Sequence, residues 1–507
     1  MKKGFDCFVI NILVFQKTLI KLVILTEPKR ISSVLDLKNN VIPENVKIIH
    51  LIAVCGTAMA ALAAMLKDMG YQVNGSDQKV YPPMSEFLAR KQIHVHDGFN
   101  GLNINSDTDL VIVGNAVRKD NPEVTITGER GLAFCSMPQA INHFIAQDKK
   151  LLVVTGTHGK TTTSSLLAWI LFHAGLDPSY VIGGMLKNFN SNYRLGNGEY
   201  MIIEGDEYDT AFFDKGPKFL HYSPFAAVLT GIEFDHADIF KDIFSIRRAF
   251  TAFIEKISPS RLVLAYDADS NIRRISSSSG YPFVYYGKNP QSGWYLSNVE
   301  LDGSRTFFQV YKDGKFFGKF QTPLMGEHNL LNALPVIAIC HHIGMDHGVI
   351  SSGLESFDGV NRRQEVRGIK KGVTIMDDFA HHPTAVRETI RAVKPFYPHG
   401  RIIAVFEPRT NTSMRNVFQD IYPLSFDGAD LICVRKPPLL EKIPKNERFS
   451  SEQLVQKLQN LGKSAWYFDD TEPIIEFLVK TVKSGDLVLI MSNGGFDNIH
   501  QRLLNAL

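Results

Sequence analysis

The segment LLVVTGTHGKTTTSSLLAWI, residues 151–170, combines residue types that bind phosphate. An apolar run typical of a buried strand is followed by a turn with two glycines, then by Lys160 and Thr161 at the start of a helical pattern. This order suits a phosphate loop, because backbone N–H groups and a helix N-terminus would face the anion, with the lysine on its terminal groups and the threonine on magnesium. The GxxxxGK[ST] pattern would place glycine at Val154, so an ordinary glycine-bearing turn stays the alternative.

Acidic side chains follow two later apolar runs. EGDEYD supplies Glu204, Asp206, Glu207 and Asp209, and FDHAD places His236 between two aspartates. Ligands of parallel sheets gather at the carboxyl ends of strands, and carboxylate oxygens are the ligands that Mg²⁺ prefers. The two segments therefore predict a shared metal site beside the phosphate loop. A solvated acidic loop and a structural histidine are the alternatives.

A second glycine-bearing turn, VCGTAMAALA, follows the first strand-like run. It departs from GxGxxG, because Ala53 and Ala60 stand where glycines would help. Asp77 follows the next strand-like run, where an acidic side chain would reach a ribose hydroxyl. The pattern indicates a nucleoside diphosphate site, with packing of Ala60 and Ala61 against a sheet as the alternative.

The last part of the chain contains GVNRRQEVRG, DDFAHHPTAV and FEPRTNTSMRN. The guanidinium groups of Arg362 and Arg363 suit phosphate or carboxylate, although adjacent arginines are usually solvated at the surface. Asp377 and Asp378 end a strand-like run, and two histidines precede the proline that opens a helix. These ionisable groups predict a site, and a helix cap with solvent-facing histidines is the alternative.

Strand-like runs alternate with helical patterns over most of the chain, which predicts α/β domains with parallel sheets. We expect a nucleotide-binding domain at 46–148, a phosphate-loop domain at 149–357 and a third domain at 358–507, preceded by an extension of unknown role at 1–45. Alternating patterns with DG turns predict a small antiparallel insert at about 293–321.

The composition is typical of a globular chain in a reducing cytoplasm. The 507 residues carry 55 basic and 52 acidic side chains without a long charge run, which argues against nucleic acid as a partner. The five cysteines form no CxxC pair, which argues against a disulfide framework. The apolar stretch CFVINILVFQKTLIKLVIL resembles an anchor or signal, but Lys17 and Lys21 interrupt it and no small-residue cleavage site follows, which argues against a membrane role.

The motifs GTHGKTTT, EGDEYD, FDHAD, GEHNLLNAL, GVNRRQE and DDFAHHPTAV occur in the order seen in Mur ligases, and the chain resembles that family over about residues 46–507. The resemblance implies a Rossmann-like domain for a UDP sugar, a central P-loop domain for ATP, and a Rossmann-like C-terminal domain that closes over the site and helps to bind the incoming amine. It also implies an ATP-dependent ligase that forms an amide through an acyl phosphate, with Mg²⁺ as cofactor and ADP and phosphate as products.

The resemblance also implies roles for single residues. Catalytic roles fall to Lys160, His236 and Arg363, and metal-binding roles to Thr161, Glu204 and His236, the histidine serving a second metal or the reacting groups. The implied ATP-binding residues are Gly156, Thr157, His158, Gly159, Lys160, Thr161, Thr162, His328, Asn329, Asn332, Arg363 and Asp378. The implied UDP-sugar-binding residues are Gly56, Thr57, Asp77 and Asn115.

Four stretches, VCGTAMAALA, VYPPMS, DTAFFDKGPKFLHY and MSNGGFDNIHQRLL, favour one activity within the family. It is the joining of UDP-N-acetylmuramate to the tripeptide L-alanyl-γ-D-glutamyl-meso-diaminopimelate in murein recycling. A UDP-N-acetylmuramate–L-alanine ligase of de novo synthesis and a non-catalytic regulator that binds UDP sugar and ATP stay open. A nicotinamide dehydrogenase is disfavoured by the degenerate glycine turn. Alanines at 53, 60 and 61 depart from the family's glycines and limit how closely backbone approaches a pyrophosphate.

Overall fold

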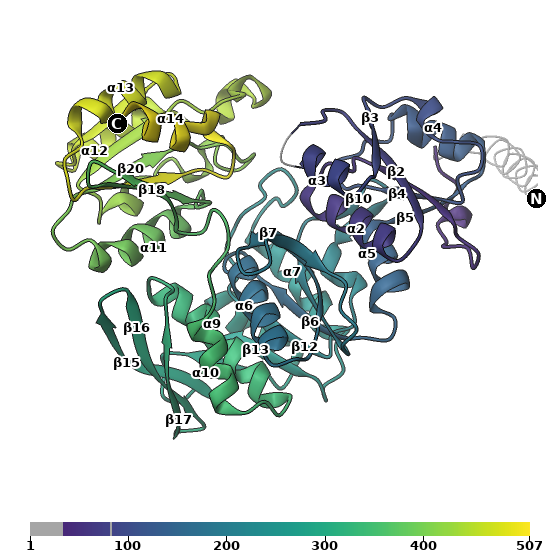
Figure 1. Cartoon of the computed structure of the whole chain (residues 1–507), viewed down its shortest axis with the longest axis horizontal. Coiled ribbons are helices and arrows are strands. Elements are labelled where there is room, and N and C mark those ends of the chain that lie inside the picture. The colour runs from purple at the N-terminus through teal and green to yellow at the C-terminus, as the bar shows by residue number, and fades with distance from the viewer. Residues whose placement is uncertain (1–33, 82–83) are drawn as a thin grey trace, which may run out of the picture.

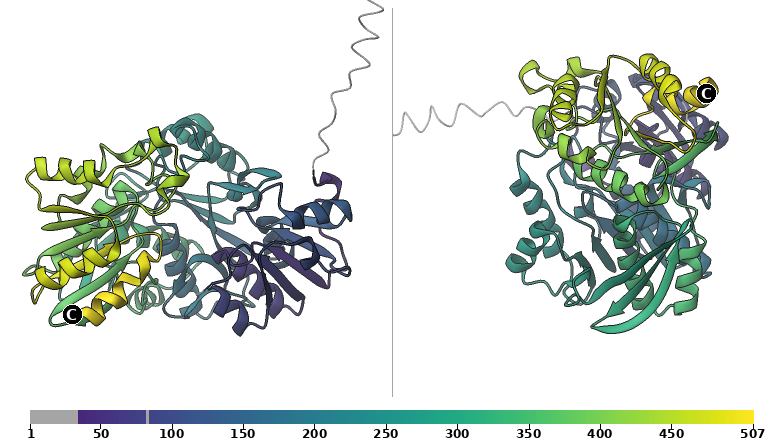
Figure 2. Two further views of the ribbon diagram at one scale, coloured as in Figure 1. Left: turned by 90° about the horizontal axis from the view of Figure 1, so that it is seen from above. Right: turned by 90° about the vertical axis from the view of Figure 1, so that its left-hand side faces the viewer.

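A computed structural model describes residues 34–81 and 84–507. Three main β-sheets succeed one another along the chain, and each has helices packed on it (Figure 1). The N-terminal sheet and the C-terminal sheet form separate lobes on two sides of the central sheet, as the additional views also show (Figure 2). The predicted three-domain α/β architecture is confirmed, and the residues chosen as domain boundaries stay predictions.

The N-terminal sheet is parallel throughout, with strand order β3-β2-β1-β4-β5. The order reverses between β1 and β4, and parallel α/β sheets generally bind ligands outside the carboxyl ends of the strands at such a point. The strands are β1 (Ile48–Ile52), β2 (Gln72–Asp77), β3 (His94–Asp97), β4 (Leu110–Val113) and β5 (Ala133–Ser136). The helices are α2 (Thr57–Asp68), α3 (Met84–Arg90), α4 (Pro122–Glu129) and α5 (Met137–Ile141).

The central sheet has ten strands in the order β17-β16-β15-β14-β13-β12-β6-β9-β7-β8. They are β6 (Lys150–Thr155), β7 (Ser179–Leu186), β8 (Ser191–Arg194), β9 (Tyr200–Gly205), β12 (Ala226–Leu229), β13 (Leu262–Tyr266), β14 (Val284–Gly287), β15 (Trp294–Asp302), β16 (Arg305–Lys312) and β17 (Lys315–Thr322). The helices are α6 (Lys160–His173), α7 (Ile243–Glu255), α8 (Ser270–Ser279), α9 (Glu327–His342) and α10 (His347–Glu355). A separate hairpin joins β10 (Asp209–Ala211) to β11 (Asp214–Pro217).

The predicted antiparallel strands are present as β15, β16 and β17, with tight turns at the two DG pairs. They continue the edge of the central sheet, because β15 also pairs in parallel with β14. Alternate side chains of β16 are buried, which explains the alternating sequence pattern.

The C-terminal sheet has the order β18-β19-β23-β20-β21-β22, and only its first strand is antiparallel to its neighbour. The strands are β18 (Glu365–Lys370), β19 (Val373–Asp378), β20 (Ile402–Phe406), β21 (Leu431–Arg435), β22 (Ala465–Phe468) and β23 (Leu487–Met491). The α-helices are α11 (Pro383–Val393), α12 (Ser451–Asn460), α13 (Thr471–Thr481) and α14 (Ile499–Ala506). The segment after β20 forms short 3₁₀ turns where the sequence predicts a longer helical segment.

The part of the N-terminal extension that is described, residues 34–45, packs on the N-terminal domain. Leu35 is buried beside β1 and β4 residues, and Gln139 donates a hydrogen bond of 2.7 Å to Asn40 Oδ1. The apolar stretch with Lys17 and Lys21 lies outside the described residues. Within 34–81 and 84–507, no helix is long and apolar enough to cross a membrane.

A buried carboxylate links three segments of the N-terminal domain. Glu123 of α4 is inaccessible to solvent, and its carboxylate lies 3.4 Å from His50 Nε2. The same carboxylate accepts hydrogen bonds from the Ser76 hydroxyl and from Asn103 Nδ2, the latter at 2.7 Å. Burial alone would raise the pKa of Glu123, but these hydrogen bonds, led by that with His50, hold it below its ordinary value.

We expect Glu123→Ala to lower the free energy of unfolding of the N-terminal domain by about 3 kcal/mol, because its donors are left buried without an acceptor. Urea unfolding of the full chain, monitored by circular dichroism, should show the first unfolding transition at a lower urea concentration than in the wild type. Glu129→Ala, at the exposed end of the same helix, is the matched control. Equal midpoints for the two variants would contradict this role.

Candidate active site

The glycines of the phosphate loop are required by its backbone geometry. Between β6 and α6 the chain passes through Gly156 at φ 133° and Gly159 at φ 78°, conformations that L-residues rarely adopt. A Cβ on Gly159 would lie 2.3 Å from Asn332 Oδ1, and one on Gly156 would lie 2.3 Å from Thr230 Oγ1. The loop therefore packs tightly against α9 on one side and against the segment after β12 on the other.

Hydrogen bonds fix the loop to the segment that follows β12. The Thr157 N–H donates to the Gly231 carbonyl at 2.8 Å, and the Glu233 N–H donates to Thr157 Oγ1 at 2.9 Å. The Thr230 hydroxyl donates to the His158 carbonyl. Thr157 and His158 thus shape the loop, and their contact with phosphate stays a prediction.

Lys160 begins α6 and is paired with a carboxylate of the EGDEYD segment. Its Nζ lies 2.8 Å from Glu207 Oε2 and 2.7 Å from the Gly156 carbonyl, and both charged side chains are nearly buried. Burial alone would lower the pKa of Lys160, but the charges of Glu207 and Asp206 raise it to about 12. The ammonium group is therefore charged and held at the mouth of the loop.

The predicted magnesium ligands lie together. Thr161 Oγ1 donates to Glu204 Oε2 at 3.2 Å, and the Gly183 N–H donates to the other carboxylate oxygen at 2.7 Å. Burial and the neighbouring charge of Asp206 raise the pKa of Glu204. A hydroxyl and a buried carboxylate beside further carboxylates form a hard-oxygen set that fits Mg²⁺.

His236 reaches the same cluster from the loop after β12. Its Nε2 lies 3.3 Å from Glu207 Oε1, and its backbone is left-handed at φ 54°. Burial alone would lower the pKa of His236, but Glu207 and Asp235 raise it. Glu207 therefore lies between the predicted phosphate lysine and the predicted catalytic histidine.

The sequence analysis missed Lys218, which is buried and pairs with Asp206 at 3.0 Å. It lies in the DTAFFDKGPKFLHY stretch, directly after the β10–β11 hairpin. Its sequence signal was weak, because a lysine after a hairpin is normally solvated.

The GEHNLLNAL residues lie at the N-terminus of α9. Asn332 contacts the phosphate loop, and Asn329 Nδ2 donates to Gln364 Oε1 at 3.0 Å, which joins α9 to the GVNRRQE segment. Burial lowers the pKa of His328 to about 4, so its imidazole is neutral. Asn332 thus packs against the loop, and Asn329 links α9 to the third domain. Contacts of Asn332, Asn329 and His328 with the nucleotide stay predictions.

The adjacent arginines of GVNRRQE have different environments. Arg362 donates to the carbonyl groups of Ser492 and Gly494 at 2.6 Å, so it stabilises the C-terminal domain. The Arg363 guanidinium lies 4.7 Å from the centre of the Phe379 ring. Burial lowers the pKa of Arg363, opposed by the nearby charges of Asp378 and Glu204. Arg363, from the third domain, thus lies close enough to the predicted magnesium ligand Glu204 for their charges to interact.

Asp378 is buried and its carboxylate accepts the N–H groups of Gln364 and Ala380, each at 2.8 Å. It fixes the turn beside Arg363. Burial raises its pKa, opposed by the charge of Arg363. A direct contact of Asp378 with nucleotide stays a prediction.

Three family profiles match successive parts of the chain. Residues 48–149 match "Mur ligase family, catalytic domain", residues 154–340 match "Mur ligase middle domain", and residues 362–494 match "Mur ligase, glutamate ligase domain". The chain is also 38% identical over 460 residues to the UDP-N-acetylmuramate–L-alanyl-gamma-D-glutamyl-meso-2,6-diaminoheptandioate ligase of Escherichia coli (strain K12), a match that covers 90% of this chain and 98% of that protein. The chain belongs to the Mur ligase family.

Two further relatives of this Mur ligase bear on its specificity. It is 33% identical to the UDP-N-acetylmuramate–L-alanine ligase of Syntrophomonas wolfei subsp. wolfei (strain DSM 2245B / Goettingen), over 91% of this chain and 97% of that one. Among solved structures, the murein peptide ligase of Psychrobacter arcticus 273-4 superposes with a TM-score of 0.67 at 32% identity, covering 91% of this chain and 98% of that one.

The four predicted UDP-sugar residues of this Mur ligase do not share one environment. Gly56 caps α2 and Thr57 begins it after β1, Asn115 follows β4, and all three are exposed at the carboxyl ends of these strands, where the strand order reverses. Asp77 ends the neighbouring β2, and its carboxylate accepts the Cys55 N–H at 2.9 Å, so it fixes the turn before α2. Contact of these residues with UDP sugar stays a prediction.

Ala53 occupies the first turn position in the left-handed region, at φ 66°. An alanine held in this left-handed conformation costs about 1 kcal/mol. Ala60 and Ala61 are fully buried in α2, where they pack in the domain core.

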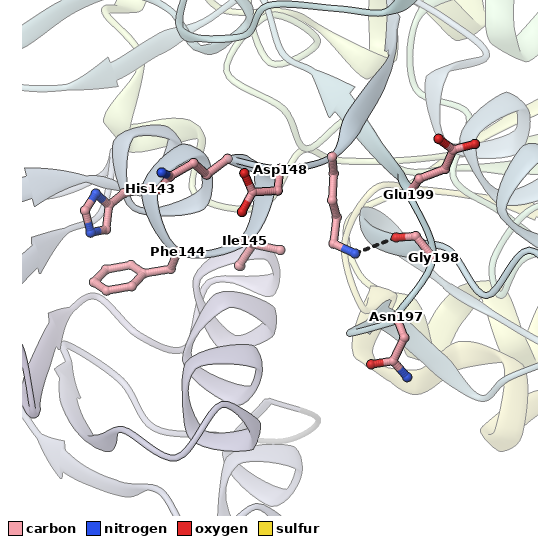
Figure 3. Close-up of a pocket in the computed structure, with 9 residues that line it drawn as sticks. His143, Phe144, Ile145, Asp148, Asn197, Gly198 and Glu199 are labelled. Atoms are coloured by element: carbon pink, nitrogen blue, oxygen red, sulfur yellow. Dashed lines mark hydrogen bonds between the residues drawn. The ribbon is translucent and has the colours of Figure 1, made fainter.

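The pocket drawn in Figure 3 is not part of this site. It is lined by residues 143–145, 147–149 and 197–199, at the amino ends of β6 and β9, whereas the phosphate loop and the acidic cluster lie at their carboxyl ends. Lys149 donates there to the carbonyl groups of Gly196 and Gly198 at 2.9 and 2.7 Å, which ties the domain connection to the turn before β9.

We expect Glu207→Gln to lower the pKa of His236, because the carboxylate opposes the effect of burial. Titration of ¹³C-labelled histidine by NMR, with the resonance identified by its loss in His236→Gln, measures this change. In the wild type the pKa of His236 lies above its unfolded value near 6.5, so its protonation stabilises the fold at lower pH and that contribution is lost as pH rises through the folded pKa. Asp209→Asn, in the same segment but paired with exposed Lys215, is the control. An unchanged His236 titration in Glu207→Gln would contradict the assignment.

Proposed function

We propose that this Mur ligase joins UDP-N-acetylmuramate to the tripeptide L-alanyl-γ-D-glutamyl-meso-diaminopimelate, with ATP as second substrate and Mg²⁺ as cofactor, in peptidoglycan recycling. The observation that carries the proposal is the convergence of Lys160, the Thr161–Glu204 pair and Arg363 at the carboxyl ends of the central strands β6 and β9. The name of the 38% identical Escherichia coli relative supports the tripeptide as the amine substrate.

The reaction needs phosphate activation, because a carboxylate has no good leaving group for attack by an amine. Bound ATP with Mg²⁺ would supply the phosphoryl group that turns the muramyl carboxylate into an acyl phosphate, from which the amine expels phosphate. Lys160 and Arg363 carry positive charges that offset charge on the transferring group. Thr161 and Glu204 would hold the cation beside them.

His236 is our candidate for the group that accepts the proton that the amine loses on attack. Glu207 orients the imidazole and stabilises the imidazolium that forms when the neutral ring accepts a proton. A metal-ligand role is the alternative for this residue, since the same nitrogen faces the acidic cluster.

The C-terminal domain completes the site through polar contacts with the loop that carries His236. Asn411 Nδ2 donates to Asp238 Oδ2 at 2.9 Å, and the Ala237 N–H donates to Thr412 Oγ1 at 3.1 Å. We propose that these contacts of the FEPRTNTSMRN segment form on domain closure and exclude water, which would otherwise hydrolyse an acyl phosphate.

The substrates are small molecules, and we place the reaction in the cytoplasm, where ATP is available. The four cysteines in the described ranges 34–81 and 84–507 are free thiols, which is compatible with a reducing compartment. The second candidate function is the addition of L-alanine, favoured by the 33% identical relative of that name.

The amine specificity is tested by ADP release with ATP, Mg²⁺ and UDP-N-acetylmuramate. We expect kcat/KM for the tripeptide to exceed that for L-alanine by about a hundredfold or more, because a site built for a larger polar substrate leaves groups unpaired with a smaller one. Reactions without UDP-N-acetylmuramate are the control. Preference for L-alanine would support the second candidate, and binding of both nucleotides without ADP release would support a non-catalytic regulator.

We expect Lys160→Ala to reduce the rate about a thousandfold or more, as for other charged contacts to a transferring phosphoryl group. Binding of UDP-N-acetylmuramate, measured by calorimetry, should persist because its predicted site lies in another domain. Lys150→Ala is the matched control, since Lys150 begins β6, the strand before the loop, and pairs with Glu199 at the surface. Near-normal turnover of Lys160→Ala would remove the phosphate-loop assignment.

A further inference from the structure

Three side chains from separate segments place ligand atoms together beside the phosphate loop. His158 lies between β6 and α6, Glu233 follows β12, and His382 caps α11 of the C-terminal domain. Glu233 Oε2 is 3.6 Å from His158 Nε2 and 3.6 Å from His382 Nδ1, and all three ligand atoms lie within 4.8 Å of one another. Four-coordinate zinc with bonds of about 2.0 Å needs neighbouring ligand atoms about 3.3 Å apart, so the two pairs that involve Glu233 need only a small contraction and the two imidazole nitrogens would move together on binding.

His382 Nδ1 faces the cluster, where it accepts the Thr384 N–H at 3.2 Å, a contact that a bound cation would replace. Its Nε2 lies 3.3 Å from the Phe234 carbonyl, which can only accept, so the proton is on Nε2. A ring nitrogen that donates to a carbonyl while the other nitrogen faces a cation is the usual arrangement of a metal-bound histidine. Burial and the neighbouring His158 lower the pKa of His382 to about 3, so the imidazole is neutral.

Glu233 and His158 are also suited to bind a cation. Thr384 Oγ1 donates to Glu233 Oε2 at 2.7 Å and orients the carboxylate. Burial would raise the pKa of Glu233, but His158 and Thr384 lower it to about 2, so the carboxylate is ionised. His158 Nε2 is shielded from solvent and has no hydrogen-bond partner within the described part of the chain. A buried nitrogen without a partner is costly, and a cation between these side chains would satisfy it.

We propose that His158, Glu233 and His382 form a transition-metal site for Zn²⁺ that links the phosphate loop to the C-terminal domain. Two imidazole nitrogens and one carboxylate oxygen match the donor set of zinc sites that keep a fourth position for water. The Glu233 side chain is 39% exposed, which provides an entry path and space for that water. These donors are distinct from Thr161 and Glu204, the hard-oxygen pair of the predicted magnesium site.

The ion would act as a clamp between domains. His158 and Glu233 belong to the central domain and His382 to the C-terminal domain, so binding requires the two to be close together. Because a cation that binds the closed arrangement shifts the population toward it, zinc would favour closure. The inference rests on the geometry of the three side chains and holds whichever amine the enzyme uses.

The test uses full-length protein without a histidine tag, freed of metal by dialysis against EDTA. Zinc affinity is measured by competition with a chromophoric chelator, in the absence of nucleotide. We expect one zinc equivalent to bind, and we expect His382→Gln and Glu233→Gln each to weaken that binding at least about tenfold. His381→Gln is the matched control, because this neighbouring histidine is not part of the cluster. Its Nε2 lies 3.9 Å from Asp235 Oδ2 instead.

Two further measurements accompany the zinc titration. Thermal unfolding of the metal-free variants shows whether each one is folded before zinc is added. Anomalous X-ray scattering at the zinc edge then locates the ion, and a peak between the three side chains would support the site. Wild-type protein that binds no zinc at micromolar concentration, unchanged affinity in His382→Gln and Glu233→Gln, or a peak only at another cluster would each overturn it.

Discussion

The position of β6 between β12 and β9 is the constraint on which the candidate active site depends. These three strands are parallel and in register, so the phosphate loop, the EGDEYD segment and the FDHAD loop all lie at the carboxyl ends of the strands, on the same side of the sheet. Neighbouring parallel strands lie about 4.8 Å apart, which places side chains from the three loops within contact distance. The Lys160–Glu207–His236 chain of contacts is the direct result.

The cluster at the carboxyl ends of these strands combines buried carboxylates with buried ammonium groups. Glu204, Asp206 and Glu207 are opposed by the ammonium groups of Lys160 and Lys218. Glu207 and Asp206 each have a lysine partner, whereas Glu204 is stabilised by a hydroxyl and a backbone N–H and has a raised pKa. Within the described residues Glu204 forms no direct ion pair, and burial of its charge is costly, so an incoming cation is stabilised most strongly beside Glu204.

The central domain contacts its two neighbours in different ways. On the N-terminal side Phe87 packs edge-on against Tyr193, and one apolar core contains residues of both domains. On the C-terminal side the contacts near the site are hydrogen bonds and ion pairs, such as those of Thr384 and Asn411 with the loop after β12. Polar interfaces favour relative motion of domains, so closure of the C-terminal domain is the expected mode of assembly.

The sequence by itself determined the α/β class, the phosphate loop and the acidic strand ends, because glycine-bearing turns, strand periodicity and helix starts are local properties of the chain. Gly156 and Gly159 could be assigned in this way, and the left-handed angles of the structure agree with that choice. Lys218 and the pairing of Glu233 with His382 of the C-terminal domain could not be predicted from the sequence. Their contacts join residues of high sequence separation or of unremarkable type, as His382 and Glu233 do across 149 positions in the chain numbering. Only the tertiary structure decided which carboxylate pairs with Lys160 and why Arg362 and Arg363 differ, because charge pairing depends on distances that strand order and domain packing set.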